Sequence, residues 1–79
     1  MRMKKNPHLV SLGQNLSALR HVKHLTQEQL AEKAGLDPSY ISGIERGVRN
    51  PSYLSLVRLA SGLKTEPSVI CAKQEPVKS

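Results

Sequence analysis

Apolar residues recur at helical spacing in the first third of the chain. Leu9, Leu12, Leu16 and Leu19 follow one another at steps of three and four residues, which places them along one face of an α-helix. The residues before Leu9 are polar and carry no such pattern. The sequence therefore predicts a flexible polar arm over residues 1–8 and a helix that runs to about Lys23.

Two short helices should follow in close succession. Thr26 opens a capping-box pattern that starts a helix, and Gly35 suits the left-handed residue that ends it. Asp37 can cap the next helix almost at once. Helices joined by so tight a turn must cross at a steep angle, so this segment predicts a helix-turn-helix over about residues 27–46.

The last part of the pattern predicts one more helix and a final turn. After a loop, a helix should begin at Ser52 or Tyr53 and end near Leu63, because apolar residues again share one face. Pro67 can open one further helical turn, although so brief a segment has little stability of its own.

Composition supports an all-α fold. Phe and Trp are absent and there are only two Tyr, so the core must be built from aliphatic residues, which favours packed short helices. We expect one domain over residues 9–71, a compact bundle of five short helices. A disordered tail should follow over residues 72–79.

Charge adds a constraint on partners. Twelve Lys and Arg stand against six Asp and Glu, giving a net charge of +6, which suits an anionic partner such as nucleic acid or an acidic membrane surface. The single Cys71 cannot form an internal disulfide, and no long apolar run or signal-peptide pattern occurs. A cytoplasmic protein without a cofactor is the expectation.

Five blocks of sequence together resemble the lambda repressor and Cro-like helix-turn-helix family, also called the XRE family, over roughly residues 9–70. The blocks are Leu16-Ser17-Ala18-Leu19-Arg20, Leu25-Thr26-Gln27-Glu28-Gln29-Leu30-Ala31, Ala34-Gly35-Leu36, Tyr40-Ile41-Ser42-Gly43-Ile44-Glu45-Arg46-Gly47 and Arg49-Asn50-Pro51-Ser52. The fourth block looks particularly like the controller proteins of restriction–modification systems.

The resemblance implies a transcriptional regulator that binds double-stranded DNA. Its recognition helix, about residues 38–46, would enter the major groove. The family is commonly dimeric, so a homodimer on a pseudo-palindromic operator is expected, with half-sites about 34 Å apart. The apolar residues near the carboxyl half could make the dimer contact or cover the monomer core: Leu54, Val57, Val69 and Ile70.

Helical periodicity divides the faces of the recognition helix. Ile41 and Ile44 define its buried side, and Tyr40 lies on the flank. The opposite face should carry Ser39, Ser42, Gly43 and Arg46.

The resemblance assigns base contacts by position to the early hydroxyl-bearing residues Ser39, Tyr40 and Ser42. Pro38 and Gly43 stand where many relatives have long polar side chains, and neither can contact a base edge. We therefore expect operator choice to depend substantially on DNA shape, the amino-terminal arm and half-site spacing.

The remaining site residues are assigned by resemblance to support and phosphate contact. Gln27 resembles the family glutamine that braces the DNA backbone and the recognition helix. Arg46, Arg49 and Asn50 stand where the family touches phosphates, although each alone could be a solvated loop residue. Arg20 and Glu45 match a structural ion pair that links the first helix to the recognition helix.

Other functions find less support. His21 and His24 could share a metal, but no further ligand stands at suitable spacing. So small a helical domain has little room for a substrate pocket, which argues against an enzyme. The main alternative is an antitoxin-like or adaptor module that uses the same fold for protein interaction, because fold alone does not fix function.

Overall fold

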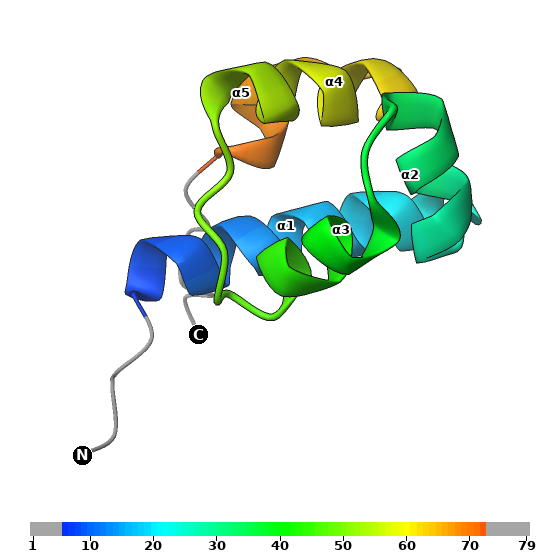
Figure 1. Ribbon diagram of the computed structural model, residues 1–79. Coiled ribbons are helices and arrows are strands. Elements are labelled where there is room, and N and C mark those ends of the chain that lie inside the picture. Colours follow the sequence, from blue (N-terminus) through cyan, green and yellow to red (C-terminus); the bar gives the residue numbers. More distant parts are fainter. Residues whose placement is uncertain (1–5, 73–79) are drawn as a thin grey trace.

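The computed structural model describes residues 6–72, and within them five α-helices and no strand. The helices are α1 (Pro7–Val22), α2 (Gln27–Ala34), α3 (Pro38–Glu45), α4 (Tyr53–Leu63) and α5 (Pro67–Ile70). In Figure 1, α1 and α3 form one side of the bundle, α4 and α5 form the other, and α2 closes one end. The predicted all-α bundle of five short helices is confirmed.

The first helix begins earlier than the apolar pattern indicated. The Asn6 side chain accepts a hydrogen bond of 2.8 Å from the backbone N–H of His8, and Pro7 occupies the first helical position. The predicted arm over residues 1–8 is thus wrong for its last two residues, which are helical, because a polar cap starts a helix without any apolar residue. Residues 1–5 of the arm, and residues 73–79 of the predicted tail, lie outside the described residues.

The predicted caps of α2 and α3 are present. Thr26 and Gln29 bond each other's backbone N–H groups at 2.9 and 3.0 Å, and Gly35 ends α2 at φ 69°. The Asp37 carboxylate accepts the N–H of Ser39 at 2.8 Å. These caps satisfy amide groups that a helix end leaves unpaired, so they fix where the two helices start and how tightly they follow each other.

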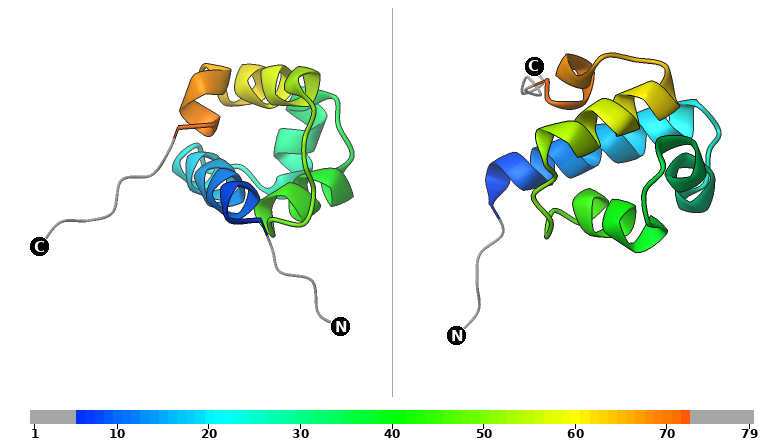
Figure 2. Two further views of the ribbon diagram at one scale, coloured as in Figure 1. Left: turned by 90° about the vertical axis from the view of Figure 1, so that its left-hand side faces the viewer. Right: turned by 45° about the horizontal axis from the view of Figure 1, so that its top comes forward.

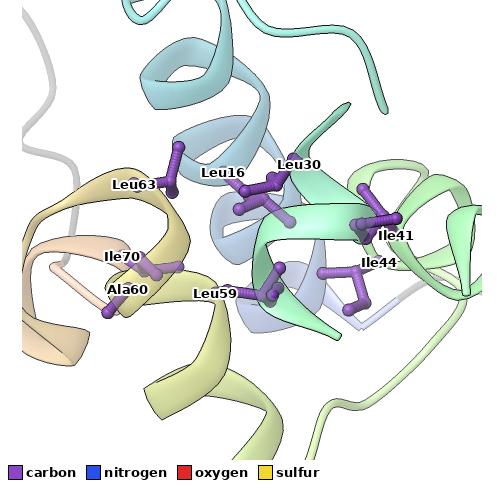
Figure 3. Packing of buried hydrophobic residues seen from close by; sticks show 10 residues of the cluster. Leu16, Leu30, Ile41, Ile44, Leu59, Ala60, Leu63 and Ile70 are labelled. Atoms are coloured by element: carbon purple, nitrogen blue, oxygen red, sulfur yellow. The ribbon is translucent and has the colours of Figure 1, made fainter. Parts of the chain in front are cut away.

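The core collects aliphatic side chains from all five helices. Figure 3 shows Leu16, Leu30 and Leu59 converging on the side chains of Ile41 and Ile44. All five are fully buried. Burial of each such side chain is worth about 1.5–3 kcal/mol, so the two isoleucines hold α3 firmly by its inner face.

A glycine sets the distance between α1 and α3. A Cβ atom built on Gly13 would collide with the carbonyl oxygens of Ile44 and Glu45, the last residues of α3. The two helices lie side by side (Figure 2). This role could not be predicted from the sequence, because a glycine inside a helical pattern such as Gly13 is unfavourable for the helix and carries no other local signal.

Candidate nucleic-acid interface

The outer face of α3 presents small polar residues and one long cation. Ser39 and Arg46 are exposed and Ser42 is partly exposed. Ile41 and Ile44 point into the core (Figure 3), as the helical periodicity predicted. The face is therefore positioned by the packing of its own reverse side.

Gly43, which the helical periodicity places on the outer face, is buried there. The Arg49 side chain lies across it, and a Cβ on Gly43 would collide with Cγ of Arg49. The guanidinium carbon of Arg49 is 5.8 Å from the centre of the Tyr40 ring, within cation–π range. Arg49 thus lies against the first half of α3, although it follows the helix in the chain.

The helical periodicity placed Arg46 on the outer face but gave no such place to Arg49, which follows the helix. The loop folds back because the N–H of Val48 donates to the Gly43 carbonyl at 3.0 Å. No periodic pattern encodes that path. The usable signal was Gly43 itself, since a glycine inside a helix often marks a close approach.

The hydroxyl groups of Ser39, Tyr40 and Ser42 on α3 already have intramolecular partners. Ser39 Oγ donates to the Asp37 carboxylate at 2.6 Å, which with the Ser39 N–H bond lowers the pKa of Asp37. Arg46 Nε donates to Ser42 Oγ at 3.4 Å. Tyr40 Oη donates to Ser55 Oγ at 3.2 Å, which ties α3 to the start of α4. In this arrangement Ser39 offers a ligand acceptor lone pairs.

A buried ionic cluster joins α1, α2 and the end of α3. Arg20 contacts the two Glu45 carboxylate oxygens through Nε at 2.7 Å and Nη2 at 3.0 Å. Gln27 Nε2 donates to the same carboxylate at 3.0 Å, and Arg20 Nη1 donates to the Leu25 carbonyl at 2.8 Å. The side chains of Arg20 and Glu45 are only 11% and 8% exposed. Their hydrogen bonding raises the pKa of Arg20.

This cluster gives Arg20, Glu45 and Gln27 a positioning role. The carboxylate receives a hydrogen bond from each of two other helices, so the end of α3 is fixed relative to both. Gln27 contacts the end of α3 through Glu45, whereas its contact with the DNA backbone stays a prediction. Asn50, the last of the predicted site residues, lies exposed in the loop beyond Arg49.

The structure also bears on metal binding and membrane insertion. Over residues 6–72, no three His, Cys, Asp or Glu side chains gather closely enough to hold a metal ion. His21 Nδ1 contacts the Ser17 carbonyl oxygen at 2.7 Å within α1. None of the helices in this range has the length and apolarity that crossing a bilayer would require.

The chain belongs to the helix-turn-helix family, whose sequence pattern matches residues 16–70. It is 46% identical to the restriction-modification controller protein C.AhdI from Aeromonas hydrophila, over 82% of this chain and 98% of that one, with a TM-score of 0.81. It is 38% identical to C.Esp1396I in a structure bound to a 19 base pair DNA duplex, over 82% and 87% of the two chains, with a TM-score of 0.76.

A third relative is the immunity repressor protein of Bacillus phage phi105, 41% identical over 69 residues, which are 87% of this chain. The alignment spans about half, 48%, of that repressor's length. The resemblance to the helix-turn-helix family, and the likeness to restriction–modification controller proteins within it, are confirmed. These relatives are regulators rather than enzymes.

Proposed function

We propose that this protein regulates transcription by binding double-stranded DNA with α3 in the major groove. The observation that carries the proposal is the division of α3 into two faces. Ile41 and Ile44 are fully buried, while Ser39 and Arg46 face outward beside the folded-back Arg49. A short helix held by its inner face and edged by cations is suited to the major groove.

The outward residues divide by chemistry into two groups of contacts. Ser39, Tyr40 and Ser42 carry the hydroxyls that can meet base edges. Gln27, Arg46, Arg49 and Asn50 are proposed to contact the DNA backbone, which fixes orientation without reading sequence. Gly43 acts indirectly, because its missing side chain leaves room for Arg49.

We propose that the regulator is a homodimer whose subunits meet through α4 and α5. Leu54 and Val69 are 58% and 42% exposed, and Tyr53 is 75% exposed, which leaves apolar surface for a partner subunit. Ile70 is fully buried, so it covers the monomer core and is not included in the proposed dimer contact. Sedimentation at micromolar concentration should give the mass of two chains.

Cytoplasmic location and the absence of catalysis complete the proposal. A regulator must reach the DNA that it controls, and the relatives named above are regulators. The proposed DNA-binding domain covers residues 9–71, extended at its start to Pro7, where α1 begins.

The test begins by selecting binding duplexes from random DNA and measuring affinity for the best one by fluorescence anisotropy. The logarithm of the binding constant should fall with the logarithm of salt concentration, with a slope of about −0.9 for each phosphate contact. Arg46→Ala and Arg49→Ala should each weaken binding and reduce that slope by about 1. Lys33→Gln, on the exposed side of α2, is the control and should change neither.

One result would contradict the proposal, and a second would contradict a narrower hypothesis about operator choice. Failure to enrich any duplex would favour the adaptor or antitoxin-like alternative, because such a module needs no DNA. Sharp preferences at every base of the half-site would instead contradict the narrower hypothesis that DNA shape and half-site spacing dominate operator choice.

A further inference from the structure

A hollow of about 360 Å³ opens where α1 and α4 end beside α2. Figure 2 shows these two helix ends at one end of the bundle, next to α2. The hollow is lined by Lys23, Leu25, Lys33, Gly62, Leu63 and Lys64. None of the residues proposed to contact DNA lines it, so it is a separate surface.

The rim of the hollow is cationic, and part of its lining is apolar. Lys23, Lys33 and Lys64 come from three different helix ends, and no carboxylate lines the hollow. Within residues 6–72, the one ion pair is that of Arg20 with Glu45, so none of the three lysines is neutralised there. Leu25 is half-buried and supplies apolar surface, whereas Leu63, only 1% exposed, belongs to the core beneath the hollow.

Helix dipoles explain part of this arrangement but leave a surplus of positive charge. Each lysine lies in the last turn or at the cap of its helix, where a cation offsets a carbonyl end that carries about −0.5 charge. Three such ends offset about half of the charge of three lysines. The remainder is available to an anionic partner.

The backbone beside the hollow adds a second observation. Among residues 6–72, four have positive φ, and two of them are Gly35 and Gly47. The other two are His24 at φ 58° and Lys64 at φ 56°. Lys64 lines the hollow, and His24 lies between two lining residues, Lys23 and Leu25. Glycine adopts this left-handed conformation without strain. Position 64 nevertheless carries a lysine, which the conformation disfavours.

We propose that this hollow is a docking site for an acidic segment of another protein. The segment would place one apolar side chain against Leu25 and set carboxylates beside the lysines. A free phosphate would make no contact with the apolar surface of Leu25, which is why a peptide fits better than an anion alone. The site lies apart from α3, so a regulator bound to DNA can hold the partner at the same time.

The test uses the full chain without DNA and a labelled peptide in which one leucine is flanked by three glutamates on each side. Binding is followed by fluorescence anisotropy. K33Q/K64Q should weaken binding about fivefold or more, because each exposed charge pair contributes a factor of roughly two to five. The matched control K73Q/K78Q removes the same charge outside the described residues and should leave binding unchanged. Replacing the leucine of the peptide by alanine should also weaken binding.

A second variant separates docking from helix capping. Lys64→Gly should raise the melting temperature, because glycine accepts the left-handed backbone, and should still weaken peptide binding. A raised melting temperature with unchanged peptide affinity would show that Lys64 only caps α4.

Other results would also overturn the proposal. These are no binding of the peptide, equal loss in K73Q/K78Q, or equally strong competition by inorganic phosphate. A loss of operator affinity in K33Q/K64Q as large as the loss of peptide affinity would assign the surface to the DNA backbone. Since the peptide is measured without DNA, failure here leaves the regulator function untouched.

Discussion

Replacing Glu45 by alanine should be among the most damaging single changes in the described part of the protein. The carboxylate accepts hydrogen bonds at 2.7 and 3.0 Å from Arg20 and at 3.0 Å from Gln27. Its removal leaves the guanidinium, whose side chain is 11% exposed, with only the Leu25 carbonyl as a hydrogen-bond acceptor. Stranding one partner of a buried ion pair costs about 3–5 kcal/mol.

That cost is large beside the total stability of a domain of this size, about 5–15 kcal/mol. It lowers the ratio of folded to unfolded protein by about a hundredfold to a few thousandfold. For a domain of this length, each kcal/mol corresponds to about 4–8 °C, so the melting temperature of Glu45→Ala should fall by at least about 12 °C. Circular dichroism at one fixed protein concentration measures this, because dimerisation makes the melting temperature depend on concentration.

Two further variants make the reasoning refutable. Glu32→Ala removes an exposed carboxylate of α2 and should change stability by less than about 0.5 kcal/mol. Arg20→Met with Glu45→Leu replaces both charges by apolar groups and should cost less than Glu45→Ala alone. A cost below about 1 kcal/mol for Glu45→Ala, or a double variant as unstable as the single one, would refute the stranded-charge argument.

Three other predictions follow from close contacts. Gly43→Ala should displace Arg49 and lower operator affinity by about tenfold, because one charge-assisted contact is lost. Alanine has the higher helix propensity, so stability should stay equal or rise. Unchanged operator affinity would contradict this prediction. Gly13→Ala forces a Cβ against backbone carbonyls and should destabilise by about 1–3 kcal/mol in urea unfolding. Ser39→Ala should raise the pKa of Asp37 toward the ordinary value of 3.8, as read by NMR titration. Because the folded pKa is lowered, the stabilisation is present above the unfolded pKa and is lost as pH falls through the folded one; an unmoved pKa would show that Ser39 is not its cause.

The features that could be predicted from sequence are local ones. The capping box at Thr26, the glycine that ends α2 and the Asp37 cap act over two to four residues, and each stands where its residue types indicated. Periodicity likewise placed Ile41 and Ile44 inward. The start of α1 was missed because Asn6 and Pro7 are a polar start signal that an apolar pattern does not contain.

The features that were missed depend on the path of the chain in three dimensions. Arg49 covers Gly43 only because the loop turns back along α3. Gly13 has a role only once α1 and the end of α3 meet. The lysine hollow joins residues from positions 23 to 64, so spacing along the chain gives no sign of it.

Apart from Tyr40, which also bonds the start of α4, the side chains of α3 that attach it to its scaffold are not those offered to a ligand. Ile41, Ile44 and Glu45 make the long-range contacts, whereas Ser39 hydrogen-bonds only with the cap of its own helix and Ser42 with Arg46 at its end. Exchange of the outward side chains should therefore redirect the protein to new targets without refolding it. Such a scaffold lets DNA-binding specificity diverge through a few substitutions on α3 while the core that holds α3 stays unchanged.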